Sequence, residues 1–219
     1  MGRSRLAIVI PALNESATIA VVVEAVARYG VPIVVDDGST DNTAAQAKQA
    51  GAVVVMHENN QGYDAALNSG FKKAAELGCD VIITIDADGQ HDPSLIQKFV
   101  DAIDEGADAV AGIRNRRQRF AEHLFAWYAN FRFGIKDPLC GMKAYRTVVY
   151  EVLGHFDSYG SVGTELMIFA AKRGYRLVQI EFQVQERKGQ SRFGQIVVGN
   201  YKIIRAMLHT TLRAKSIRC

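Results

Sequence analysis

Acidic and amide side chains follow short apolar runs at three places in the first ninety-one residues. The first place contains Asn14 and Glu15, the second contains Asp36 and Asp37, and the third is the segment 86–91, Asp-Ala-Asp-Gly-Gln-His. Such side chains can bind a divalent cation, accept hydrogen bonds from a ligand, or begin a helix. The fold that positions them decides between these roles.

The third cluster has the spacing of a metal site. In an extended segment alternate residues point the same way, so Asp86 and Asp88 can direct both carboxylates to one point. With the Gln90 amide, and with His91 as a further candidate, they offer ligands for Mg²⁺ or Mn²⁺. We therefore predict a metal site formed by Asp86, Asp88 and Gln90.

Each acidic cluster also has a simpler interpretation, because turns from strand to helix favour Asp, Asn, Gly and Ser for capping alone. Asp41, between Thr40 and Thr43, is expected only to begin a helix. Asp36 and Asp37 are less easily explained in this way, since adjacent carboxylates repel each other.

Alternating patterns predict an α/β fold. Continuous β-branched runs at 6–10, 31–35, 52–56, 81–85 and 107–111 indicate buried strands, separated by predicted helices at 16–29, 41–50, 62–77 and 94–105. Asp92-Pro93 is expected to begin the last of these helices. This alternation implies a parallel sheet, whose ligands bind beyond the carboxyl ends of the strands. The three acidic clusters fall at such ends.

The second half is less regular. It predicts an aromatic helix at 120–133, a loop at 154–163, a helix at 164–173, a strand at 176–184 and a helix from 195 onward. No repeat or linker is evident, so we predict one domain over 1–219, with halves 1–115 and 116–219. We expect the aromatic helix to pack on the sheet; lipid contact is the alternative. Its aromatic residues are Phe120, Phe125, Trp127, Tyr128, Phe131 and Phe133.

Charge and cysteine content limit the environment. The 219 residues include three cysteines without a CxxC pair, which is typical of a cytoplasmic protein with reduced thiols. From Arg187 to the end there are eight Lys or Arg and no Asp or Glu, so an anionic partner is expected there. Nucleic acid is disfavoured because Tyr201 is the one aromatic after Phe193. No apolar run of 18 residues exists, so membrane contact would be peripheral.

Missing motifs narrow the chemistry. The sequence contains no GxGxxG after the first strand, no GxxxxGK[ST] and no GxSxG. A site built from acids needs a divalent cation between itself and a phosphate. The pattern therefore favours diphosphate chemistry through a metal.

These motifs resemble the inverting family 2 glycosyltransferases, which have the GT-A fold. The matching segments in the first half are 8–11, 14–15, 34–43, 60–62 and 86–91. The second half resembles the dolichyl-phosphate mannosyltransferase and polyprenyl-phosphate sugar transferase branch at 112–114, 137–146, 163–165 and 187–192. The arginine-serine pattern that this branch places before Ala129-Asn130 is not evident. The resemblance implies a Rossmann-like, mostly parallel sheet flanked by helices.

The resemblance also implies roles for individual residues. A nucleoside would be held by Pro11, Leu13, Glu15, Val35 and Asp37, with Asp86 and Ala87 flanking the nucleotide and Asp88 and Gln90 on the metal. Arg114, Arg187 and Arg192 are candidates to clamp phosphates, because the arginine fork matches phosphate oxygens. The expected catalytic residues are Asp88, Arg114 and Asp137.

The implied reaction transfers a hexose from GDP-mannose or a UDP-hexose to a polyprenyl or dolichyl phosphate. A phosphate oxygen is already anionic near neutral pH, since the second pKa is about 6. A saccharide hydroxyl, the alternative acceptor, would need a base, and Asp137 could supply it or could only cap a turn. A sugar nucleotidyltransferase and a noncatalytic nucleotide-sugar binder are further alternatives.

The predicted C-terminal helix is amphipathic and basic. An apolar stripe of Val197, Tyr201, Ile204, Leu208 and Leu212 neighbours a stripe of Lys202, Arg205, His209 and Arg213. The apolar stripe can face the core, or it can lie on the inner face of a membrane as a peripheral contact. Both alternatives stay open from sequence.

Overall fold

The computed structural model describes residues 4–89, 91–115, 119–183 and 196–213; within α8 the side chains of 196–198, 212 and 213 are not described. Within these residues one sheet has the strand order β3-β2-β1-β4-β6-β5-β7. Its strands are β1 Leu6–Ala12, β2 Val31–Asp36, β3 Val53–Met56, β4 Val81–Thr84, β5 Ala109–Arg114, β6 Lys143–Arg146 and β7 Leu177–Phe182.

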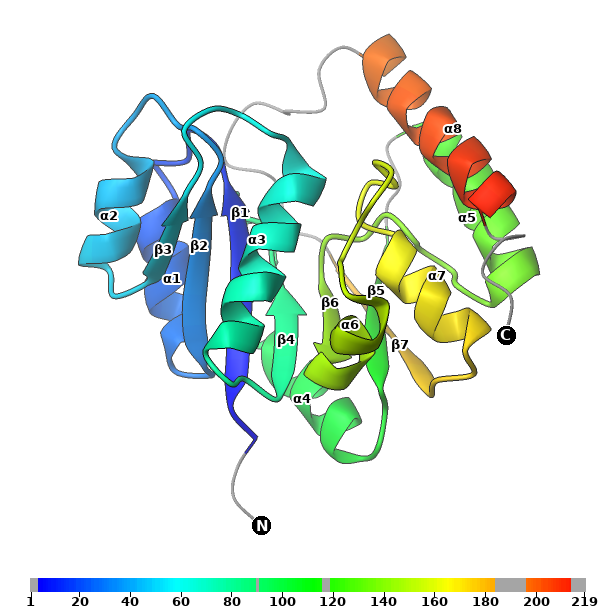
Figure 1. Ribbon diagram of the computed structural model, residues 1–219, viewed down its shortest axis with the longest axis horizontal. Helices are drawn as coiled ribbons and strands as arrows, with labels where there is room; N and C mark the ends of the chain where they lie inside the picture. Colours follow the sequence, from blue (N-terminus) through cyan, green and yellow to red (C-terminus); the bar gives the residue numbers. More distant parts are fainter. Residues whose placement is uncertain (1–3, 90, 116–118, 184–195, 214–219) are drawn as a thin grey trace.

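Helices cover both faces of the sheet (Figure 1). One apolar core lies between the sheet and α1 Ile19–Ala27, α2 Thr43–Gln49 and α4 Leu95–Asp104. The opposite core contains α3 Tyr63–Glu76, α5 Phe120–Phe133, α6 Thr147–Leu153 and α7 Glu165–Lys172, and α8 Ile196–Arg213 packs beside α5. The predicted α/β architecture is confirmed. None of the helices in the described part of the chain is long and apolar enough to cross a membrane.

The structure adds one antiparallel strand to the predicted sheet. β6 lies between β4 and β5 and is antiparallel to both, while the other neighbouring strands pair in parallel. β6 has only four residues, and two of them, Lys143 and Arg146, are charged. The apolar pattern therefore did not predict this strand. The parallel strands therefore end at the same edge of the sheet, where the acidic turns follow β1, β2 and β4.

The start of α4 differs from the prediction. The helix begins at Leu95 with Ser94 as its N-cap residue, so the expectation that Asp92 is the N-cap and Pro93 the first-turn proline is wrong. The Asp92 carboxylate nevertheless accepts the Ser94 N–H at 2.8 Å, and this hydrogen bond lowers the pKa of Asp92.

Close packing of α3 on the sheet depends on Gly70. A Cβ added there would lie 2.2 Å from Val9 Cγ1 and 3.2 Å from Val35 Cγ2. Gly70 thus lets α3 approach the two strands that lead into the first two acidic turns.

We expect Gly70→Ala to destabilise the protein by about 1–3 kcal/mol, the usual range for overpacking. The sign is informative, because helix propensity alone favours Ala over Gly by about 1 kcal/mol. Urea unfolding measures the change. The control Lys72→Ala, on an exposed position of the same helix, is expected to stay within about 0.5 kcal/mol of wild type. Stabilisation by Gly70→Ala would contradict the packing argument.

Candidate active site

The turn after β4 carries Asp86 and Asp88 at the carboxyl edge of the sheet. The Asp86 side chain is 31% exposed, whereas Asp88 is buried. Gly141, just before β6, lies directly against Asp86, since an added Cβ would be 2.3 Å from Asp86 Oδ2. The Tyr63 hydroxyl donates to Asp86 Oδ1 at 3.4 Å, and burial together with the Asp86 charge raises the Tyr63 pKa well above 10.

His91 lies beneath the same carboxylate. Its ring is buried, with Nδ1 at 3.9 Å from Asp86 Oδ2, and it meets the Phe182 ring edge-on at 5.7 Å between centroids. Nδ1 is a buried polar atom for which the described part of the chain offers no hydrogen-bond partner. A buried polar atom without a partner is costly, and it suits a pocket that receives a polar ligand.

The donor chemistry of these residues suits a divalent cation of the kind that also binds substrate phosphates. Among the described residues, no cluster of three or more His, Cys, Asp or Glu could hold a metal ion. Mg²⁺ usually binds through one or two carboxylates plus substrate phosphates, and Asp86 and Asp88 match that donor set. Gln90, the third predicted ligand, lies outside the described residues.

The turns after β1 and β2 are tied together by hydrogen bonds. Asn14, with φ of 51°, donates its N–H to Ser39 Oγ at 2.8 Å and accepts the Thr40 N–H through its side chain at 2.8 Å. Slight desolvation raises the pKa of the exposed Asp41 carboxylate, but hydrogen bonds from Thr43, at the start of α2, and from Ser16 outweigh it and lower the pKa to about 2. Asp41 thus serves the helix start, as expected.

Asp37 is buried in a network that the sequence did not indicate. Its carboxylate accepts the N–H groups of Gln61 at 2.9 Å and Gly62 at 2.8 Å, and contacts His57 Nδ1 at 2.7 Å. His57 Nε2 in turn lies 2.8 Å from Ser69 Oγ. Asp37 therefore fixes the segment 57–62 that leads into α3. Its contact with a nucleoside stays a prediction.

The other predicted nucleoside residues lie along the same edge. Pro11 in β1 and Val35 in β2 are buried and lie opposite each other in the sheet. Leu13 and Glu15 are partly exposed on the turn after β1. Ala87 is buried between the two aspartates of the β4 turn.

Arg114 closes β5 in an ion pair with Asp137. Its Nε donates to Asp137 Oδ2 at 2.8 Å and its Nη2 to Oδ1 at 2.9 Å, and Nη2 also reaches Glu122 at 3.3 Å. Burial alone would lower the Arg114 pKa, but the hydrogen bonds and charge of Asp137 raise it above its usual range. Asp137 is fully buried and paired with Arg114, so this geometry favours a structural role over that of a general base.

A cleft of about 280 Å³ opens beside this ion pair at the ends of β5 and β7. Its lining includes Arg114, Asn115, Glu181 and Phe182. Phe182 also contacts His91, so the cleft adjoins the Asp86 turn. Arg187 and Arg192, the other predicted phosphate clamps, lie outside the described residues.

Comparison with known proteins identifies the family to which the chain belongs. Residues 7–153 match the family model described as glycosyl transferase family 2. The chain belongs to this family. It is 31% identical to the dolichyl-phosphate hexose transferase of Haloferax volcanii, over 95% of this chain and 96% of that one. It is 32% identical to the polyprenol monophosphomannose synthase of Mycolicibacterium smegmatis, over 84% of this chain and 78% of that one.

A solved structure shares the fold of this family 2 glycosyltransferase. Glucosyl-3-phosphoglycerate synthase from Mycobacterium tuberculosis, in complex with Mn²⁺, UDP and glucosyl-3-phosphoglycerate, matches with a TM-score of 0.76 and 25% identity. The match covers 94% of this chain and 79% of that one. The predicted family and the GT-A fold are thus confirmed, and the protein is a glycosyltransferase.

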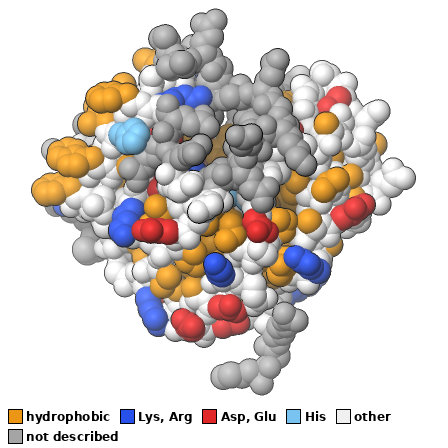
Figure 2. Space-filling model, turned by 180° about the vertical axis from the view of Figure 1, so that it is seen from behind, with side chains coloured by type: hydrophobic (Ala, Val, Ile, Leu, Met, Phe, Trp, Pro, Cys, Tyr) orange, Lys and Arg blue, Asp and Glu red, His pale blue; other side chains and the backbone are white. Residues whose placement is uncertain are grey.

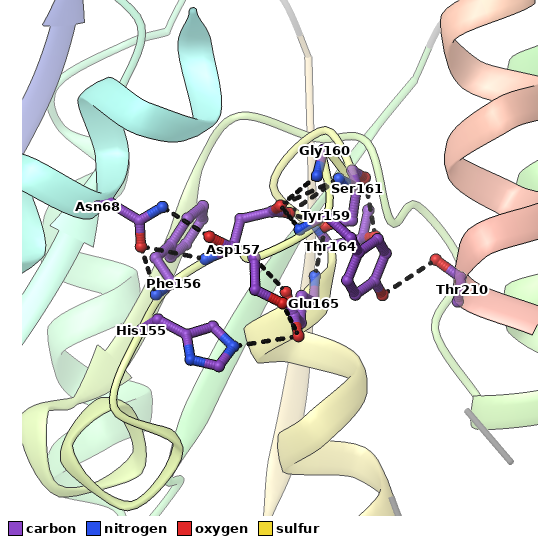
Figure 3. A network of polar contacts seen from close by, with 11 residues as sticks. Asn68, His155, Phe156, Asp157, Tyr159, Gly160, Ser161, Thr164, Glu165 and Thr210 are labelled. Atoms are coloured by element: carbon purple, nitrogen blue, oxygen red, sulfur yellow. Dashed lines mark hydrogen bonds and ion pairs between the residues drawn. The ribbon is translucent and has the colours of Figure 1, made fainter. Parts of the chain in front are cut away.

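The glycosyltransferase has a second polar network, in the loop between α6 and α7 (Figure 3). Asp157 accepts the N–H groups of Tyr159 at 3.0 Å and Gly160 at 2.7 Å, and Glu165 accepts the Ser158 hydroxyl at 3.0 Å. The Tyr159 hydroxyl lies 3.3 Å from Thr210 of α8. The loop is therefore held by the carboxylates of Asp157, within it, and Glu165, at the start of α7, and it is connected to the C-terminal helix.

Lys143 links this loop to the segment that precedes β6. Its buried ammonium donates to the carbonyl oxygens of Pro138 at 2.8 Å and Gly163 at 2.5 Å. Burial lowers the pKa of Lys143 to about 8. Burial and the negative charge of Asp157 raise the pKa of Asp64 to about 6. Sequence reasoning missed Lys143, because a lysine among short apolar segments normally indicates solvent exposure.

We expect Gly141→Ala to displace the Asp86 carboxylate, because the added Cβ would overlap it. Transfer activity should fall by about tenfold or more, as for a small misplacement of a catalytic group. Initial rates at saturating donor measure the loss, and thermal unfolding reports whether the fold is retained. Wild-type rates from a folded variant would contradict this placement of Asp86.

We expect His57→Ala to raise the KM for the sugar nucleotide about tenfold with little change in kcat, because the buried Asp37 carboxylate loses a partner. His57→Asn keeps a donor near the Nδ1 position and should recover much of the affinity. Ser69→Ala leaves the His57–Asp37 contact in place and is the milder control. If His57→Ala, His57→Asn and Ser69→Ala all keep the wild-type KM, the His57–Asp37 contact has no bearing on donor binding and the prediction is wrong.

Proposed function

We propose that this enzyme transfers a hexose, with inversion, from a nucleoside-diphosphate sugar to a polyprenyl or dolichyl phosphate. GDP-mannose and the UDP-hexoses are the candidate donors. The observation that carries the proposal is the Arg114–Asp137 ion pair beside the Asp86–Asp88 turn. The carboxylate expected to act as a base is engaged by an arginine, which suits an acceptor that is already anionic.

The metal proposal rests on the two carboxylates and on the space reserved for them. Asp86 and Asp88, with Gln90, would hold Mg²⁺ or Mn²⁺, and Gly141 leaves room for the Asp86 carboxylate. A bound cation would neutralise charge on the diphosphate leaving group. The relative from Mycobacterium tuberculosis was solved with Mn²⁺ and UDP, which supports a divalent ion here.

Donor binding is assigned to the turns after β1 and β2. Pro11, Leu13, Glu15, Val35 and Asp37 would form the nucleoside side of the site, with Asp86 and Ala87 beside the diphosphate. The hydrogen bonds that join these turns hold that side rigid before the donor arrives. Arg187 and Arg192 remain proposed phosphate contacts.

Acceptor binding is assigned to the cleft at the ends of β5 and β7. Arg114 lies at its wall, and two relatives at 31% and 32% identity carry the names dolichyl-phosphate hexose transferase and polyprenol monophosphomannose synthase. A lipid acceptor places the enzyme at a membrane surface, and we propose that it acts peripherally on the cytoplasmic side.

Transfer assays test the proposal directly. We expect a lipid-linked product from GDP-mannose, UDP-glucose or UDP-N-acetylglucosamine with a short polyprenyl phosphate and Mn²⁺, and none in excess EDTA. Asp88→Asn should lower the rate by about 10²–10³, the usual effect of removing one group that stabilises charge in the transition state. Asp101→Asn, the same change on the exposed face of α4, is the matched control.

Two results would contradict the proposal. Undiminished transfer in EDTA would remove the metal role of Asp88. Transfer to 3-phosphoglycerate or to an oligosaccharide, with none to the polyprenyl phosphate, would replace the acceptor.

A further inference from the structure

The outer face of α5 exposes large apolar side chains. Phe120 is 79% exposed, Trp127 67% and Phe131 80%, with Leu124 at 36% between them. Their spacing of four, three and four residues places them on one stripe of the helix. We expected the aromatics of this helix to pack on the sheet. Phe125 is buried in that core and Tyr128 and Phe133 pack partly against it, but the expectation is wrong for Phe120, Trp127 and Phe131.

The outer face of α8 is also apolar. Tyr201, Ile204 and Leu208 are exposed, whereas the smaller Ala206 and Thr210 and the neighbouring Ile203 are buried. The helix packs beside α5, where the Asn200 side chain accepts the Ala121 N–H at 3.3 Å. The apolar stripe predicted for this helix therefore points away from the core in the part that the structure describes.

These side chains gather on one side of the molecule. Seen from behind, hydrophobic side chains stand out from the edge on which α5 and α8 lie (Figure 2). Trp127 and Phe131 stack on each other at 6.1 Å between centroids, which leaves their outer faces open to solvent. Contiguous exposed apolar surface of this kind marks an interaction site.

The charges on α5 and α8 indicate which kind of partner fits this apolar surface. Lys202, Arg205 and Arg132 are exposed. Glu122 is the one acidic residue within 120–133 and 196–213, and it is buried in ion pairs with Arg114 and Arg119. Exposed aromatic and cationic side chains without exposed acids match an anionic bilayer surface, where Trp lies at headgroup level.

We propose that the outer faces of α5 and α8 form a docking surface for an anionic lipid bilayer, with Trp127 and Phe131 inserted at headgroup level. The choice of a bilayer over another apolar partner rests on the proposed function, since a polyprenyl phosphate resides in one. The Arg114–Glu122 contact joins the first turn of α5 to the acceptor cleft, so docking would present that cleft to the lipid.

Trp127 is the single tryptophan of the chain and reports on its own environment. The full chain is mixed with vesicles of phosphatidylcholine containing one-third phosphatidylglycerol, without polyprenyl phosphate or sugar nucleotide. We expect a blue shift of Trp127 emission, quenching by brominated lipid, and co-sedimentation that weakens at high salt and with pure phosphatidylcholine.

Matched variants distinguish insertion of these side chains from nonspecific binding to vesicles. Phe131→Ser and Phe120→Ser keep the tryptophan and should each weaken vesicle partitioning about tenfold or more, from the lost burial of one aromatic ring. Arg205→Glu should weaken it in a salt-dependent way. Met56→Ser is the control, because Met56 is 69% exposed on the distant strand β3. All of these positions are exposed, and thermal unfolding checks that each variant folds.

The outcomes distinguish this inference from the proposed function. Unchanged emission and no co-sedimentation would overturn the docking surface, even if the enzyme acts on a short, water-soluble polyprenyl phosphate. A blue shift that depends on protein concentration without vesicles, with the mass of a dimer, would assign the surface to a second copy and also overturn the inference. Vesicle binding without polyprenyl-phosphate transfer would refute only the proposed acceptor.

Discussion

The insertion of β6 between β4 and β5 is the constraint on which the rest of the site depends. Thr84, the last residue of β4, donates its hydroxyl to the Gly141 carbonyl at 2.6 Å and accepts the Lys143 N–H at 3.2 Å. These bonds hold the chain before β6 against the β4 turn. Glycine at 141 leaves room for the Asp86 carboxylate, since a Cβ added there would overlap it. The same insertion brings Asp137, which precedes β6, onto Arg114 at the end of β5.

In this arrangement the carboxylates at the carboxyl edge of the sheet differ in the partners that they contact. Asp37 is engaged by His57 and the backbone of the following segment, and Asp137 is engaged by Arg114. Asp86, in contrast, is partly exposed and borders the buried His91 ring. The partners of Asp86, the Tyr63 hydroxyl at 3.4 Å and His91 Nδ1 at 3.9 Å, are longer contacts than those of Asp37 and Asp137, so Asp86 keeps an open side for a cation. The division explains why the metal is assigned to the β4 turn.

Much of the fold was predictable because its strands are continuous β-branched runs that begin and end near turn residues. The parallel strands, the helices between them and the acidic edge follow from that pattern. β6 did not follow from it, because Lys143 is buried with carbonyl partners that an apolar pattern does not reveal, Pro138 just before the strand and Gly163 twenty residues further along the chain. The Arg114–Asp137 pair likewise joins residues 23 apart, which spacing alone does not indicate. The orientation of α5 was ambiguous because apolar residues occur on both of its faces.

The central claim is that Asp86 and Asp88 hold a divalent cation together with the diphosphate of the donor. The most direct measurement is Mn²⁺ binding followed by electron paramagnetic resonance, in the presence and absence of GDP or UDP. If protein carboxylates and diphosphate share the ion, each ligand must strengthen the other, since binding coupling is reciprocal. We predict weak Mn²⁺ binding alone, markedly tighter binding with the nucleotide, and loss of this gain in Asp88→Asn. Mn²⁺ affinity that the nucleotide does not change, or that survives in Asp88→Asn, would contradict the account.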